Sequence, residues 1–211
     1  MPVSVTRACM AAVSKELARL LTSAGFRRKT PHLWREQNEL IHVINLQASP
    51  WGNSQEGQFT VNLAITNRLL YSVWSGHPFP SNPGAAVWPV QSRIGRLLGD
   101  RDMWWKVSDS TDKDALASSV AAQVRAPVLE WFSAYPGLEA LDAALAKAKK
   151  FNDVPGVYET QAPVIRAILS SLQGNTSAAR DLLSSSYASH KGKPFGETIE
   201  AIASRLRIDV A

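Results

Sequence analysis

Two stretches of alternating sequence carry side-chain amides and hydroxyls where an ordinary strand needs only apolar and charged residues. In the first stretch Asn45 and Gln47 share parity, and in the second Thr60 and Asn62 do. Side chains of a strand point alternately to its two faces. If the apolar residues of both strands face one core, the four polar groups line the opposite face. Such a face could bind a ligand or an extended peptide, or it could be an internal network that tethers loops.

A loop rich in turn-forming residues separates these two stretches. Ser49 stands before this loop, and Trp51 stands at its root. An aromatic side chain at the rim of a polar face can anchor a bound partner. The predicted binding residues are therefore Asn45, Gln47, Ser49, Trp51, Thr60 and Asn62.

A second candidate site is the basic cluster Arg27, Arg28 and Lys29, which Trp34 and Arg35 follow closely. Basic groups interleaved with aromatic residues can hold single-stranded nucleic acid by charge and stacking. The plainer interpretation is that cations after a helix C-terminus favour the helix dipole and stay solvated.

Familiar signatures of catalysis do not occur in the chain. There is no GxSxG, no GxGxxG and no GxxxxGK[ST], and no histidine stands three or four residues from another. The single Cys9 excludes an internal disulfide and a multi-cysteine metal site. We therefore predict no catalytic residue, no metal and no cofactor. An unfamiliar enzyme on the amide-bearing face would need His42 or a carboxylate beside the amides, and His42 has the opposite parity from Asn45.

The charge of +5 lies wholly in the N-terminal half. Residues 1–110 hold 12 Lys and Arg against 7 Asp and Glu, whereas residues 111–211 hold 11 against 11. An excess of this size is typical of an ordinary surface. No window holds the ~18 apolar residues that a membrane helix needs, and no apolar core of a signal peptide precedes a small-residue cleavage site. A cytoplasmic protein is expected.

The hydrophobic pattern predicts an α+β fold with a sheet of about four antiparallel strands. We expect a first helix over 10–24 capped by Gly25, strands over 32–35, 40–49, 59–66 and 103–107, and an irregular segment over 75–89. A helix should resume near Val90, and a long one should run from Asp112 towards Phe132.

The remainder of the chain is predicted to be helical. An alanine-rich helix ends in lysines near Lys150, and a weak boundary follows at residues 152–156. Three further helices are expected over 163–172, 177–183 and 197–206, the first two forming a short hairpin at Gly174. The predicted domains are an α+β main domain over 1–150 and a helical appendage over 151–211.

Several fragments of the chain together resemble a bacterial family known only as domain of unknown function 4304. The fragments are Gly25 and Phe26, Trp34 and Arg35, residues 43–47 with Ser49, residues 59–63, Arg93 and Gly95, and Asp102, Trp104, Trp105 and Val107. The resemblance covers about residues 10–135. It implies a cytoplasmic bacterial protein with no established activity, so it transfers no catalytic residue.

The sequence thus favours a non-enzymatic protein-recognition module, of which an immunity or antitoxin-type protein is one concrete form. Its support is the surplus of tryptophan, six of whose seven copies precede residue 106. A nucleic-acid-binding protein and an uncharacterised small-molecule enzyme are the alternatives.

Overall fold

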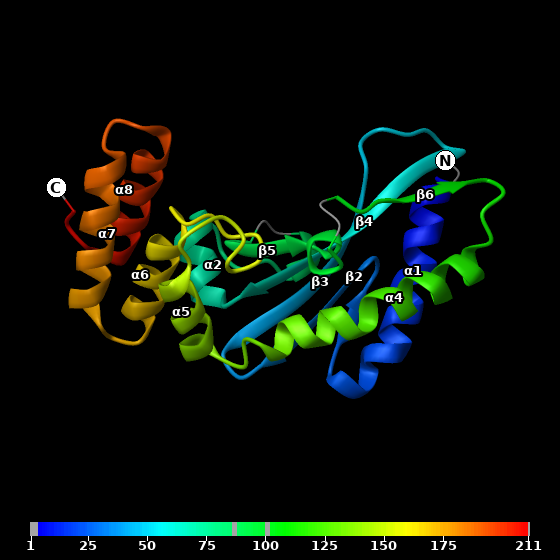
Figure 1. Ribbon diagram of the computed structural model, residues 1–211, viewed down its shortest axis with the longest axis horizontal. Helices are drawn as coiled ribbons and strands as arrows, with labels where there is room; N and C mark the ends of the chain where they lie inside the picture. Colours follow the sequence, from blue (N-terminus) through cyan, green and yellow to red (C-terminus); the bar gives the residue numbers. More distant parts are fainter. Residues whose placement is uncertain (1–3, 86–87, 100–101, 211) are drawn as a thin grey trace.

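The two longest strands, β3 (Leu40–Ala48) and β4 (Glu56–Thr66), pair antiparallel with Asn45 opposite Asn62 and Gln47 opposite Thr60. In the computed structural model, which describes residues 4–85, 88–99 and 102–210, they form the centre of one antiparallel sheet (Figure 1). The strand order is β1-β2-β3-β4-β5, and β6 also pairs with β4. The outer strands are β1 (Arg27–Lys29), β2 (His32–Gln37), β5 (Val90–Arg93) and β6 (Trp105–Ser108).

One face of this sheet is apolar and forms the main core. Ile44 and Leu46 of β3 and Val61 and Leu63 of β4 are buried there. Helices α1 (Val5–Leu21) and α4 (Lys113–Ser133) pack against each other over this face. The carboxylate of Asp112 accepts hydrogen bonds from two N–H groups at the start of α4, which fixes where that helix begins.

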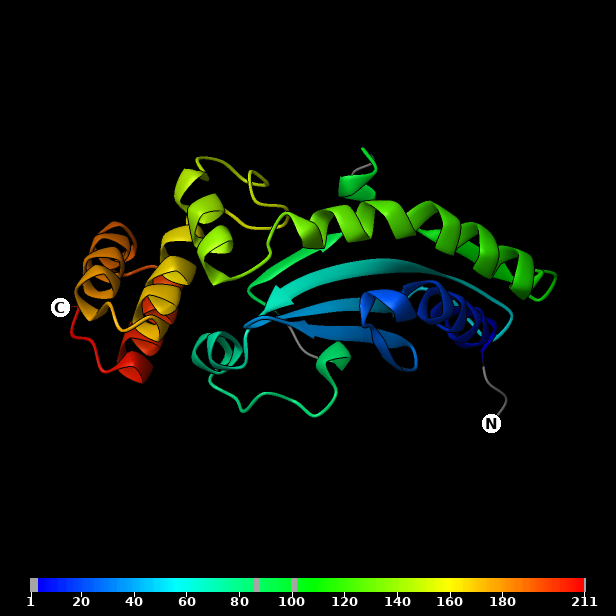
Figure 2. The same cartoon turned by 90° about the horizontal axis from the view of Figure 1, so that it is seen from below.

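The opposite face is covered at one end by a helix and a loop. Helix α2 (Arg68–Ser75) and the proline-rich segment after it lie on the side of the sheet away from α4 (Figure 2). They enclose a small second core, made of Ile41, Val43, Ala64, Tyr71 and Trp88. The rest of this face carries the amides.

The C-terminal helices lie at one end of the molecule, far from the N-terminus (Figure 1). They are α5 (Leu138–Lys147), α6 (Ala162–Leu172), α7 (Thr176–His190) and α8 (Pro194–Leu206). The main buried cluster continues into them, and α6 and α8 contact α2. Arg205 of α8 donates hydrogen bonds to the carbonyl oxygens of Val73 and Trp74 near the end of α2, at 2.7 and 3.1 Å. The division at residue 150 stays a prediction.

The α+β fold class is confirmed, as are the first helix with Gly25 in the left-handed region at its end and the long helix after Asp112. The strands predicted over 32–35, 40–49, 59–66 and 103–107 correspond to β2, β3, β4 and β6, and the helical C-terminal region with its hairpin is confirmed as well. One prediction about elements was wrong, and one helix was not predicted. The chain near Val90 forms strand β5 before the short helix α3 (Ile94–Leu97), and residues 68–75 form the unforeseen α2. With β1 and β5, the described sheet has six strands instead of about four. Among the described helices, none has the length and apolar character to cross a bilayer.

The histidine of β3 lies in the main core. His42 is fully buried, its ring stacks on Phe132 with centroids 4.4 Å apart, and its Nδ1 accepts a hydrogen bond from Arg35 Nε at 3.0 Å. Burial, reinforced by the positive charge of Arg35, lowers the pKa of His42 to about 3. It therefore stays neutral and lies on the face opposite Asn45, as its parity predicted.

Leu63 provides a test of the register. Because Leu63 is fully buried in the main core, Leu63→Ala should lower the free energy of unfolding by about 2–5 kcal/mol. Leu69, which is 59% exposed on α2, supplies the matched control, and Leu69→Ala should change it by less than about 0.5 kcal/mol. Urea denaturation of both variants measures the difference. A harmless Leu63→Ala would show that the register is wrong.

His42 also predicts a pH dependence. A histidine in the unfolded chain keeps its ordinary pKa of about 6.5, so below that pH the unfolded state binds a proton that the folded state does not. Stability therefore falls as the pH drops from about 6.5 towards 3, by about 1.4 kcal/mol per pH unit. His42→Gln should remove this component, so the wild-type protein should lose about 2 kcal/mol more than the variant between about pH 7 and pH 5. Parallel profiles in urea denaturation would contradict the buried, neutral assignment.

Candidate functional site

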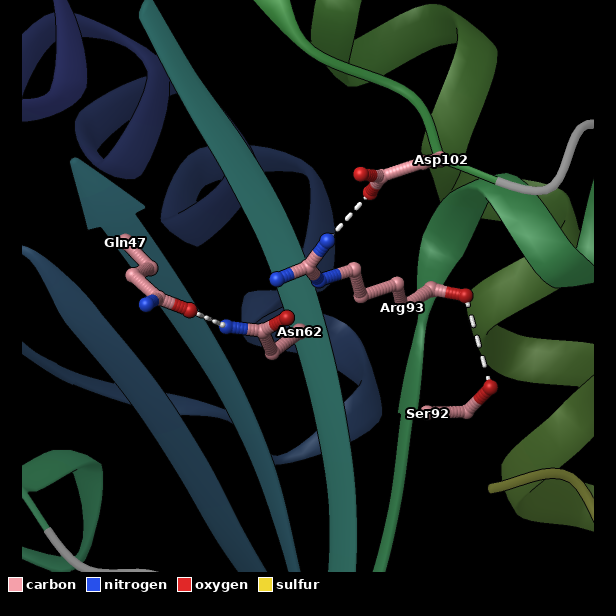
Figure 3. A network of polar contacts seen from close by, with 5 residues as sticks. All are labelled: Gln47, Asn62, Ser92, Arg93 and Asp102. Carbon is pink, nitrogen blue, oxygen red and sulfur yellow. Dashed lines mark hydrogen bonds and ion pairs between the residues drawn. The ribbon is translucent and has the colours of Figure 1, made fainter. Parts of the chain in front are cut away.

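The amide-bearing face contains an open pair of side chains from neighbouring strands. Asn62 Nδ2 of β4 donates a hydrogen bond to Gln47 Oε1 of β3 at 2.7 Å (Figure 3). Gln47 is exposed and Asn62 is half-buried. This bond fixes the orientation of both amides. The Gln47 NH₂ group and the Asn62 carbonyl oxygen therefore point away from it and can bond to other partners.

The two register partners of the open amides, Asn45 and Thr60, are closed off. Asn45 Nδ2 donates to the buried carbonyl oxygen of Gly84 at 2.6 Å, and Thr60 is fully buried. Gly84 lies so close to β2 that a Cβ there would be 2.0 Å from the ring of His32. Only glycine lets the segment approach in this way. Asn45 thus belongs to a structural contact that tethers the loop, whereas Gln47 and Asn62 do not.

Arg93 of β5 extends the row of the open amides, since it is the register partner of Asn62. Its guanidinium forms an ion pair with Asp102 (Figure 3), and its guanidinium carbon lies 5.0 Å from the ring centroid of Trp104. A hydrogen bond from the Trp104 side chain, together with the hydrogen bond from Arg93, lowers the pKa of Asp102. The carboxylate is therefore ionised and holds Arg93 in place.

A loop from the C-terminal region completes the surroundings of Arg93. Phe151 and Tyr158 lie with ring centroids 4.4 Å apart, and the guanidinium carbon of Arg96 lies 4.6 Å from the Phe151 centroid. Gly156 has a φ of +82°, and a Cβ there would be 1.4 Å from the carbonyl oxygen of Gln91. Glycine is thus required to seat this loop against β5.

These groups together line a pocket of about 490 Å³ at the surface. Three side-chain amides, two guanidinium groups, one carboxylate and two aromatic rings line it. Its lining residues are Gln47, Asn62, Gln91, Ser92, Arg93, Arg96, Asp102, Phe151, Gly156 and Tyr158. We call it the amide–arginine pocket.

The pocket contains only two of the six predicted binding residues, Gln47 and Asn62. Ser49 accepts a hydrogen bond from the Trp51 backbone N–H at 3.1 Å and so shapes the loop. Trp51, 81% exposed, lines a second pocket of about 480 Å³ with Lys106 and other residues.

The basic cluster Arg27, Arg28 and Lys29 forms the short edge strand β1, and all three residues are exposed. Trp34, however, packs against the second core, and Arg35 is engaged with His42 and with the carbonyl oxygen of Ala24. The nearby aromatic residue is therefore half-buried, which limits its use for base stacking. Binding of nucleic acid by the three cations stays a prediction.

Sequence reasoning missed most of the pocket. Arg93, Asp102 and Trp104 were noticed only as fragments of a family resemblance, and their ion pair and stacking give those fragments a physical meaning. Phe151 and Tyr158 carried no signal, because a tertiary contact between distant segments brings them to the sheet. Within the described residues, no group of three or more His, Cys, Asp or Glu side chains is arranged to hold a metal ion.

The chain is an α+β protein with a half-open polar sheet face, and it belongs to the family described as Domain of unknown function (DUF4304), whose profile matches residues 17–134. Comparison with curated proteins and with solved structures gives no match. The matched region contains Gln47, Asn62, Arg93 and Arg96, whereas Phe151 and Tyr158 lie beyond it.

Two alanine substitutions distinguish the accessible positions of the polar face from the closed ones. Because water can replace the lost bond to the exposed Gln47, Asn62→Ala should lower the free energy of unfolding by less than about 1 kcal/mol. Asn45→Ala strands the buried carbonyl of Gly84 and should cost about 1–3 kcal/mol. Urea denaturation compares them. Equal costs would place Asn62 in a buried network instead of an open site.

Proposed function

We propose that the protein is a non-enzymatic protein-recognition module that holds its partner at the amide–arginine pocket. The observation that carries the proposal is the exposed Tyr158, 52% accessible, beside two stacked arginines and two oriented amides. Tyrosine and arginine are enriched at the centres of protein interfaces, where a few such residues supply most of the binding free energy.

The rigidity of these side chains favours recognition. Arg93 is fixed by Asp102 and Trp104, and Arg96 by Phe151. Side chains ordered before binding lose less conformational entropy when a partner arrives. The amide pair is likewise held by its own hydrogen bond. Exposed Trp51 offers a further aromatic contact outside the pocket.

An immunity or antitoxin-type protein, which masks a toxin, is the concrete form that we propose. A cytoplasmic location belongs to the same proposal and is favoured by the single cysteine, which cannot form an internal disulfide. The identity of the captured partner decides between this form and any other recognition role.

A photo-crosslinking amino acid at position 158 tests the proposal. Replacing Tyr158 by benzoylphenylalanine keeps an aromatic ring at the pocket, and the protein is expressed at its native level in its host. We expect one discrete crosslinked protein adduct, which mass spectrometry identifies.

The matched control places the same amino acid at Ser177, which is exposed near the start of α7. The adduct should form from position 158 and be absent from position 177. The absence of an adduct at position 158, or the same pattern of adducts from both positions, would refute recognition through this pocket.

A further inference from the structure

Most groups of the amide–arginine pocket that can still form hydrogen bonds are N–H donors. Arg96 is exposed and stacked on Phe151, and its guanidinium forms no hydrogen bond or ion pair with a residue of 4–85, 88–99 or 102–210. The Gln47 NH₂ group likewise has no hydrogen-bond partner within these described ranges, while Gln47 Oε1 accepts from Asn62. Ligand groups that satisfy such donors are oxygen acceptors, and an ionised acceptor makes the stronger bonds.

The charge of the pocket matches a single negative charge. Arg93 and Arg96 face one carboxylate, Asp102, so the balance of the lining residues is +1. The charged residues beside Phe151 and Tyr158 in the chain leave this balance unchanged, because Lys149 and Lys150 are offset by Asp153 and Glu159. A planar carboxylate fits the fork of a guanidinium with two parallel hydrogen bonds.

We propose that the amide–arginine pocket binds the carboxylate of an aspartate or glutamate side chain on the protein partner, with Arg96 as the bidentate donor and the Gln47 NH₂ group as a second donor. This inference rests on the protein-recognition function proposed above. The exposed ring of Tyr158 then lies beside the carboxylate and can cover the main chain of the partner segment, a contact that a small free acid does not need.

NMR titration of the arginine side chains tests this assignment directly. The probe is a tripeptide, N-acetyl-Ala-Glu-Ala amide, and its uncharged counterpart N-acetyl-Ala-Gln-Ala amide is the control. The Arg96 Nε–Hε and Gln47 NH₂ signals should shift saturably with the glutamate peptide, with millimolar affinity typical of a single contact. The glutamine peptide should bind at least about tenfold more weakly, because charge-assisted hydrogen bonds are lost.

Variants separate charge from geometry. Arg96→Ala should lower the affinity for the glutamate peptide by about tenfold. Arg96→Lys keeps the charge but loses the planar fork of donors, so it should recover only part of this affinity. Arg125→Ala, at an exposed arginine of α4 outside the pocket, should leave the affinity unchanged.

Three results of the titration would overturn the inference. These are equal shifts with the glutamine peptide, tighter binding of free succinate than of the glutamate peptide, or saturation of the same signals by inorganic phosphate or oligothymidylate at much lower concentration. The proposed function is judged separately. If the adduct from position 158 still forms in the Arg96→Glu variant, protein recognition stands, and only the proposed binding of a partner carboxylate is refuted.

Discussion

The pairing register of β3 with β4 is the constraint on which the rest of the structure depends. Opposed residues share a face, so the pairs Leu46–Val61 and Ile44–Leu63 form the floor of the main core. Because side chains alternate strictly, a slip of one residue would move the amides into the core and the leucines into water. Burial of the apolar face under α1 and α4 therefore fixes the register, and with it the face on which the amides lie.

The polar residues of the opposite face are used in two different ways. Asn45 donates its hydrogen bond to a loop, and this loop can approach the sheet only because residue 84 is glycine. Gln47 and Asn62, in contrast, bond to each other and remain accessible. The accessible pair is walled by Arg93 of β5 and by the loop that carries Phe151 and Tyr158.

The strand parity that placed the amides on one face was predictable, because apolar and polar residues alternate cleanly over 59–63. The second core was not predicted, although four of the five residues over 40–44 are apolar, a run that is typical of a strand covered on both faces. Strand β5 was missed because Ile94, Leu97 and Leu98 continue an apolar helical spacing and outweigh four residues of strand. The aromatic wall of the pocket could not be predicted, since Gly156 seats on Gln91 only in three dimensions.

The side-chain amide protons of Asn62 and Gln47 report most directly on the central claim that the register leaves an oriented, accessible pair. In an isotope-edited nuclear Overhauser experiment, the Asn62 NH₂ group should show contacts to the Gln47 side chain, from which it is one hydrogen bond away. The Gln47 NH₂ group should exchange rapidly with water, because Gln47 is exposed. Contacts from the Asn62 amide to α1 or α4, together with slow exchange of the Gln47 amide, would contradict the account.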